Sequence, residues 1–190
     1  RHRVRGIELA DSLSWDGHKL LASTALSASV LFKDGALQHR LFNEDPTYLA
    51  TGHPEHEPYR HSLACTRSGM GLRLFAAMSA EGSDGRESRI NSLIETTAAF
   101  HTDLQSDPRF ETAAPPETNI LLMRPTGMRT EDDIQKMRRA LMQRGGFYLS
   151  STHHNGSHWL RVVIMNPRTS LDHLKQLAQS ISDIVTASPT

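Results

Sequence analysis

The sequence has 190 residues, and its 21 lysines and arginines are balanced by 21 aspartates and glutamates. A chain of this length can bury a sizeable core in one or two modules. Because its formal net charge is zero, no overall field draws it to nucleic acid or to an anionic membrane, and we expect neither as a partner.

The chain opens at Arg1 with RHRVRGIEL and no initiating methionine, so we expect a processed, trimmed or partial chain. No apolar run approaches the ~20 residues of a membrane span, and no signal-peptide pattern precedes the first motif. Residues 9–15 and 25–32 carry β-branched or aromatic residues in partial alternation, which predicts two strands, with a turn at 33–35.

Regular patterning stops at residues 41–62, where three prolines interrupt a stretch with no hydrophobic period. This predicts a long loop, and loops of this length inside a domain are usually functional or mobile. The one cysteine, Cys65, follows the loop. A single cysteine excludes an internal disulfide framework and favours a reducing compartment, so we expect a cytoplasmic protein.

Two helices are predicted after the loop. Residues 68–81 form the first, which ends at Gly82. Asp84 can cap a second, longer helix whose apolar residues recur at helical spacing until SDP at 106–108. We place a domain boundary at the end of this helix, which divides the chain into residues 1–105 and 106–190.

The last third has the pattern of a compact α+β unit. Residues 119–125 predict a strand, and Thr130 with Asp133 predicts a capping box for a helix that ends at Gly145. Asn155 and Gly156 separate two strand-like runs and predict a tight hairpin turn.

A terminal helix completes the predicted unit. Thr169 with Asp172 predicts its start, and leucines and isoleucines follow at helical spacing. Histidines gather in the long loop and around the hairpin, but neither group has a cysteine or an HExxH arrangement, so we expect no metal site.

The segment SLSWDGHKLL places Lys19 next to His18 at the end of the first predicted strand. A desolvated lysine is a good Schiff-base nucleophile. The alternative is a solvated surface pair at a strand end, which is the commoner fate of charged residues. The pair alone does not decide between the two.

Four motifs in this order resemble those of the group II pyridoxal-phosphate decarboxylases: SLSWDGHK at 12–19, DPTYL at 45–49, CTR at 65–67 and LRVVIMNPRT at 160–169. That family includes glutamate, aromatic amino acid, sulfinoalanine and diaminobutyrate decarboxylases. The resemblance covers essentially this whole chain but only the C-terminal part of a family member. It implies the α/β fold of fold-type I, aspartate-aminotransferase-like enzymes. Residues 1–105 would end the large cofactor domain, and residues 106–190 would form the small α+β domain.

The resemblance also implies roles for the residues around Lys19. Lys19 would hold pyridoxal phosphate as a Schiff base, His18 would contact the phosphate, and Asp16 stands where the family has Asn or Asp. Tyr48 lies 29 residues after Lys19, as does the family's loop tyrosine, which is thought to protonate the substrate Cα. The alternative for Tyr48 is a packing role in the loop.

Arg161 matches the family arginine that binds the substrate α-carboxylate, a task suited to a planar, permanently charged fork. The alternative is a strand arginine that faces solvent. Arg67 also aligns with a family arginine, for which we assign only support of the site.

The implied activity is the decarboxylation of an L-amino acid to its amine and carbon dioxide, at a site on a homodimer interface. The upstream half of the family enzyme, which supplies the partner of the pyridine nitrogen and most phosphate contacts, is needed for this activity. Two alternatives stay open: another fold-type I lyase or aminotransferase, or a truncated or split chain that is inactive without its N-terminal half. The sequence does not identify the amino acid.

Overall fold

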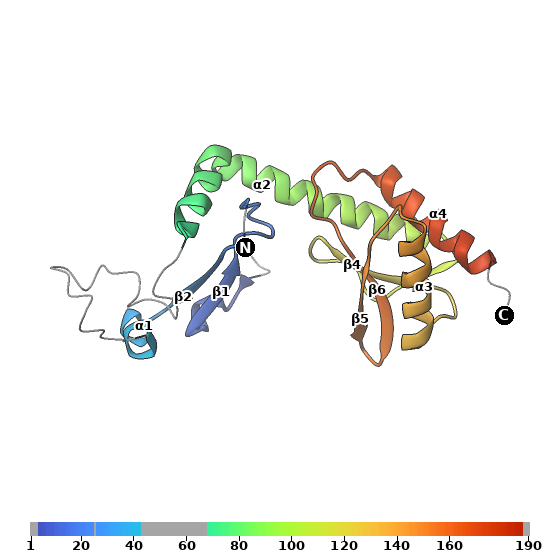
Figure 1. Cartoon of the computed structure of the whole chain (residues 1–190), viewed down its shortest axis with the longest axis horizontal. Helices are drawn as coiled ribbons and strands as arrows, with labels where there is room; N and C mark the ends of the chain where they lie inside the picture. Colours follow the sequence, from blue (N-terminus) through green and yellow to red (C-terminus); the bar gives the residue numbers. More distant parts are fainter. Residues whose placement is uncertain (1–3, 25, 43–67, 188–190) are drawn as a thin grey trace. The chain divides into compact units, whose positions relative to one another are not determined.

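The computed structural model describes residues 4–24, 26–42 and 68–187 (Figure 1). Tyr48, Cys65 and Arg67, together with most of the predicted 41–62 loop, lie outside the described residues. The chain divides into two compact units, Arg1–Arg86 and Glu87–Thr190, which are described separately. The predicted domains, 1–105 and 106–190, refer to the architecture of a longer enzyme and stay a prediction.

The first unit is built on one β-hairpin. β1 (Ser12–Asp16) and β2 (Ala28–Phe32) pair antiparallel. Both predicted strands are confirmed, but each is shorter than its pattern. At the start of the first pattern, Ile7–Leu9 forms a 3-10 turn. No helix was predicted directly after β2, yet α1 (Gly35–Phe42) begins there. Its signal is Asp34, whose Oδ1 accepts a hydrogen bond from the Ala36 amide at 2.9 Å.

Helix α2 (Met70–Gln105) contains one break. Gly82 has φ 71° and ψ 178°, a conformation that only glycine adopts readily, and the helix resumes beyond it. The predicted stop at Gly82 is therefore confirmed. Arg86 bridges the break, since its Nη2 donates to the Met78 carbonyl at 2.9 Å.

The second unit is a four-stranded antiparallel sheet with the strand order β3-β4-β6-β5. Helices α3 and α4 contact strands of this sheet and each other, as Figure 1 shows. The elements are β3 (Phe110–Thr112), β4 (Ile120–Pro125), α3 (Glu131–Gln143), β5 (Ser150–His154), β6 (Ser157–Val163) and α4 (Leu171–Ala187). Each was predicted except β3, which is only three residues long.

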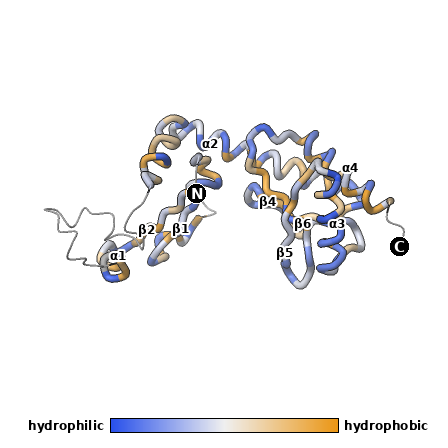
Figure 2. Tube along the Cα trace, in the orientation of Figure 1, coloured by the Kyte–Doolittle hydropathy of each residue, from blue (hydrophilic) through white to orange (hydrophobic). Residues whose placement is uncertain are grey.

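The core of the second unit lies on one face of the sheet. Leu121 and Met123 of β4 and Leu160 and Val162 of β6 are at most 3% exposed. Because side chains alternate along a strand, these residues share one face. The buried residues of α3 and α4, and those of α2 from Leu93 to Leu104, also belong to the core of this unit. Figure 2 shows β4 as one of the most hydrophobic stretches of the chain.

The caps of the second unit test two sequence predictions. The capping box of Thr130 and Asp133 is present at the start of α3, as predicted. The predicted cap of α4 at Thr169 is wrong. Ser170 takes that place, since its Oγ accepts from the His173 amide at 3.3 Å, one residue further along. At the hairpin, Asn155 (φ 48°) and Gly156 (φ 72°) both have positive φ, as the turn requires.

Candidate functional site

The segment after β1 folds back on itself through its own backbone. The Gly17 amide donates to the Ser27 carbonyl and the Ser23 amide to the Gly17 carbonyl, both at 2.9 Å. Ala22 adopts φ 54°, and its amide donates to the Lys19 carbonyl at 2.9 Å. The turn that carries His18 and Lys19 is thus tied to the start of β2.

His18 is held by a single residue nine positions away. Its Nδ1 lies 2.7 Å from the Ser27 carbonyl oxygen and 3.2 Å from the Ser27 amide nitrogen. A protonated Nδ1 donates to the carbonyl, and an unprotonated Nδ1 accepts from the amide. Ser27 therefore offers a partner to Nδ1 in either state, and the other ring nitrogen, Nε2, has no hydrogen bond within the described residues.

Lys19 and Asp16 form an ion pair at 2.6 Å. The Lys19 side chain is 62% exposed and that of Asp16 is 32% exposed, so the amine is accessible from solvent. The hydrogen bond from Lys19 lowers the pKa of the Asp16 carboxyl, against the opposing effect of desolvation. Asp16, at the end of β1, thus lies close to Lys19 on the turn that follows, and His18 lies on the same turn.

Gly17, between Asp16 and His18, is closely surrounded. A Cβ at this position would lie 2.5 Å from the Ser27 Oγ and 3.2 Å from the Leu74 Cδ1. Contacts under 3.0 Å are not tolerated without movement of a neighbour. A methyl group at Gly17 therefore does not fit while the Ser27 Oγ keeps this position, and Ser27 is the residue against which Gly17 packs.

Arg161 belongs to the second unit, where it is half-buried on β6 between Leu122 of β4 and Ser150 of β5. Its guanidinium makes no hydrogen bond or ion pair within the described residues. Arg124, on β4, behaves differently: it stacks 3.8 Å over the Trp159 ring and pairs with Glu111 at 2.7 Å. Arg161 is thus a cation available to an anionic ligand, whereas Arg124 is committed to the fold.

The hairpin histidines do not form a metal site in the described part of the chain, which holds no group of three or more potential ligands. His153 and His158 face each other across β5 and β6 with their ring centroids 4.9 Å apart.

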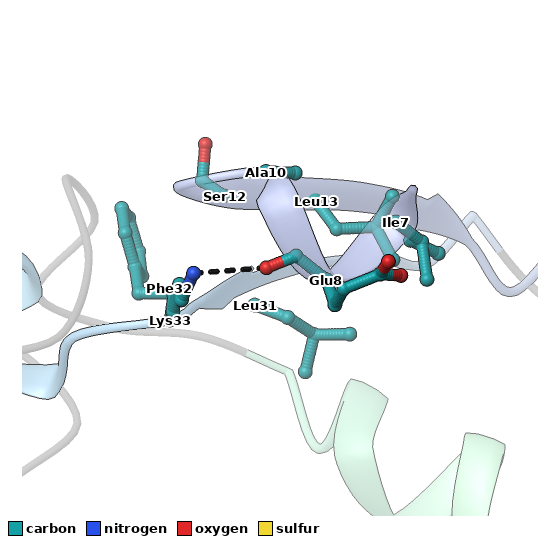
Figure 3. A pocket seen from close by; sticks show the side chains of 8 residues that line it. All are labelled: Ile7, Glu8, Ala10, Ser12, Leu13, Leu31, Phe32 and Lys33. Carbon is teal, nitrogen blue, oxygen red and sulfur yellow. Dashed lines mark hydrogen bonds between the residues drawn. The ribbon is translucent and has the colours of Figure 1, made fainter. Parts of the chain in front are cut away.

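The hairpin of the first unit also carries a hollow of about 200 Å³, lined by Ile7, Glu8, Ala10, Ser12, Leu13, Leu31, Phe32 and Lys33. Figure 3 shows the hydrogen bond of 2.9 Å from Lys33 Nζ to the Glu8 carbonyl at its rim. The hollow lies at the Ser12–Phe32 end of the strand pair, whereas the Lys19 turn follows the Asp16–Ala28 end. It is therefore separate from the candidate site.

Sequence reasoning missed Ser27, because a residue nine positions from His18 carries no motif signal of its own. It also gave no role to Gly17. The position of glycine between two polar motif residues was the one available sign that a close approach occurs there.

Among the described residues, no helix is both long and apolar enough to cross a membrane.

The model of the pyridoxal-dependent decarboxylase conserved domain matches residues 1–124. An aspartate 1-decarboxylase of Aliivibrio fischeri is 27% identical over an alignment of 214 positions, gaps included. The alignment covers 99% of this chain and 39% of that protein. The tryptophan decarboxylase TDC1 of Camptotheca acuminata is 28% identical, over 96% of this chain and 38% of its own length. The chain thus spans about two fifths of these relatives.

Solved structures show the same fold. The tryptophan decarboxylase of Catharanthus roseus in complex with L-tryptophan superposes with a TM-score of 0.81, at 22% identity, over 98% of this chain and 39% of that one. Mouse CSAD superposes with a TM-score of 0.80, at 21% identity, over 97% of this chain and 42% of its own. The expected α/β fold, that of fold-type I decarboxylases, is confirmed.

Proposed function

This chain belongs to the pyridoxal-dependent decarboxylase family, and on that premise we propose that it supplies the lysine-bearing part of an enzyme that decarboxylates an L-amino acid to an amine and carbon dioxide. The observation that carries the proposal is the turn after β1, which presents the Lys19 amine beside a His18 ring whose Nε2 has no hydrogen-bond partner among the described residues. The substrate would be a small amino acid of undetermined side chain.

The residues on this turn fit pyridoxal phosphate, the cofactor of the family. The Lys19 amine is accessible and can form a covalent bond with an aldehyde. His18 has Nδ1 occupied, which leaves Nε2 for a phosphate oxygen. An ionised Asp16 cannot donate to phosphate, so we propose that it acts in the cofactor site through its ion pair with Lys19.

When bound, pyridoxal phosphate supplies an electron sink for the electron pair that remains at the substrate Cα after carbon dioxide leaves. The nucleophile would be the uncharged amine of Lys19, whose side chain is held near the end of β1 by Asp16. His18 would hold the phosphate and so help to orient the cofactor towards the Lys19 amine.

We assign the substrate contacts to Arg161 and Tyr48. The Arg161 guanidinium would bind the α-carboxylate and orient the bond that breaks. The Tyr48 phenol would deliver a proton to Cα, as a general acid. The first assignment is supported by the guanidinium on β6, which has no partner in the part of the chain that the structure describes. The second is supported by the spacing from Lys19 alone.

We further propose that the active enzyme is a cytoplasmic homodimer whose site is completed by sequence equivalent to the N-terminal part of its relatives. The need for further sequence is supported by the share of those relatives that the chain spans, about two fifths. On its own, the chain offers one covalent bond and one phosphate contact, and we expect it to bind pyridoxal phosphate weakly.

The test is covalent trapping. The sequence has four lysines, at positions 19, 33, 136 and 175. We expect borohydride reduction of the chain at rising concentrations of pyridoxal phosphate to label Lys19 before the other three, because the neighbouring His18 would bind the phosphate. Peptide mass spectrometry measures the order of labelling.

Lys33 is the matched control, since it lies at the opposite end of the same hairpin. Equal labelling of Lys33 and Lys19 at every concentration would remove Lys19 from the cofactor site. His18→Gln should abolish the preference for Lys19 while it leaves the labelling of Lys33 unchanged.

A further inference from the structure

The His18 ring is held entirely by the main chain of Ser27. Both contacts of Nδ1, at 2.7 Å and 3.2 Å, are to backbone atoms of that residue. The Ser27 carbonyl also accepts from the Gly17 amide at 2.9 Å. A shift of the Ser27 backbone would therefore change the position of the His18 ring.

The Ser27 side chain, unlike its main chain, makes no hydrogen bond with another described residue. Ser27 is 6% exposed, and its Oγ has no hydrogen-bond partner in the described part of the chain. Its neighbour is Gly17, where a Cβ would lie 2.5 Å from this Oγ. The second neighbour of such a Cβ, Leu74 Cδ1 at 3.2 Å, is the end of a flexible side chain and can move. The Ser27 side chain and Gly17 thus make a close van der Waals contact, in which the Ser27 Oγ forms no hydrogen bond.

We propose that Gly17 is a positioning residue: because it has no Cβ, the Ser27 main chain can lie where it binds Nδ1 of His18, which leaves Nε2 to meet the cofactor phosphate. This inference rests on the proposed function for the identity of the anion. The packing itself is a property of the chain without cofactor, so it can be measured separately.

Three variants distinguish this packing from a general need for a stable hairpin. Gly17→Ala places a methyl group against the Ser27 Oγ and should displace the backbone that holds His18. Ser27→Ala removes a hydroxyl without a partner and should leave His18 in place. The double variant, Gly17→Ala with Ser27→Ala, removes the clash and should return the His18 ring to its original position. Gly35→Ala is the matched control, because a Cβ at Gly35 meets nothing within 4 Å.

The first readout needs no cofactor. Long-range ¹H–¹⁵N NMR of the histidine-labelled chain reports the hydrogen bonding of each ring nitrogen, and His18→Gln assigns the signals. We expect the Nδ1 signal of His18 to move towards that of a free imidazole in Gly17→Ala, and to return in the double variant. An unchanged Nδ1 signal in Gly17→Ala, or no return in the double variant, would overturn the positioning role.

The second readout is a titration with pyridoxal phosphate. In the unchanged chain, addition should shift the Nε2 signal and leave Nδ1 hydrogen-bonded. Gly17→Ala should raise the half-saturating concentration by about tenfold or more, the effect of one lost charge-assisted hydrogen bond. Ser27→Ala should stay within about twofold of the unchanged chain, and so should Gly35→Ala.

The outcomes separate the two proposals. If Lys19 is labelled preferentially but Nε2 does not respond, Lys19 stays the cofactor lysine, whereas the phosphate contact of His18 and this inference both fail. If the Gly17→Ala effect and its reversal occur but neither Lys19 nor Nε2 responds to pyridoxal phosphate, the packing is established. The assignment of this site to the cofactor is then overturned.

Discussion

The two units of the chain differ in how well they cover their own apolar residues. In the described part of the first unit, Leu21 is the one buried apolar side chain, while Trp15, Val30 and Leu31 are 47%, 55% and 50% exposed. In the second unit, buried apolar residues extend from Leu93 to Ile184 and fill the space between sheet and helices.

This contrast shows that the two units depend differently on further protein. A two-stranded hairpin is marginally stable in water, and exposed apolar residues on both of its faces indicate surfaces that other protein would cover. A four-stranded sheet with two helices on one face can bury enough apolar area to be stable by itself. The residues proposed to bind the cofactor therefore lie in the unit that the chain stabilises least.

Of the variants considered, those that remove a buried side chain should show the largest difference in stability between the two units. Leu160 is 0% exposed, and Leu160→Ala should lower the free energy of unfolding by about 2 to 5 kcal/mol through lost burial and a cavity. Leu31→Ala, on the exposed hairpin, should change it by about 0.5 kcal/mol or less. Chemical denaturation of both variants measures the difference, and a large loss in Leu31→Ala would show that the hairpin shares the core's stability.

Removal of the Glu111 charge should have a smaller effect. Glu111 accepts hydrogen bonds from the Nη2 and Nε of Arg124 at 2.7 Å and 3.0 Å, and the Arg124 side chain is only 6% exposed. Glu111→Gln keeps the shape but leaves a buried guanidinium without its carboxylate. We expect a loss of about 1 to 3 kcal/mol in the free energy of unfolding.

The same pair predicts a pH dependence. Hydrogen bonds from Arg124 and, less strongly, from Arg129 lower the pKa of Glu111 in the folded state. A depressed carboxyl pKa contributes stability that is fully present above the unfolded-state value, and this stability is lost as the pH falls through the folded-state value. The stability difference between the unchanged chain and Glu111→Gln should therefore shrink in acid. A difference that stays constant would contradict the assigned cause.

The helix caps give the smallest expected effect. The Asp133 amide donates to the Thr130 Oγ1 at 3.2 Å, and Thr130→Ala should cost about 1 kcal/mol of unfolding free energy. Asp34→Ala removes the corresponding contact at α1 of the first unit and should leave the main unfolding transition unchanged. Thermal unfolding compares the two, with Thr130→Ser as the conservative control. Equal shifts in both alanine variants would contradict the contrast between the units.

The fold could be predicted from the sequence where local chemistry determines it. The break at Gly82, the capping box at Thr130 and the hairpin turn at Asn155 each depend on residues within a few positions. The strand β3 could not be predicted, because three residues carry no period and the strand exists through its pairing with β4. The cap of α4 was misplaced by one residue because Thr169 and Ser170 both suit the position.

In the candidate site, too, some features follow from the local sequence and others depend on residues far apart in the chain. Asp16, His18 and Lys19 lie within four consecutive residues, so their closeness in space follows from the motif. The role of Ser27 depends on how the chain returns to pair β2 with β1, which the motif does not encode. Of the remaining assigned residues, Tyr48 lies outside the described residues and Arg161 lies in the second unit. Their roles stay proposals.

Hydrogen exchange of the whole chain, read by mass spectrometry, tests most directly whether the unit that carries Lys19 lacks stability of its own. We predict slow exchange for the amides of β4, β6, α3 and α4, because their opening requires unfolding of the core. The amides of β1, β2 and the Lys19 turn should exchange faster by orders of magnitude, and only slightly slower after addition of pyridoxal phosphate. Equally slow exchange in both units of the unliganded chain would show that the first unit is stable as it stands, and would contradict this account.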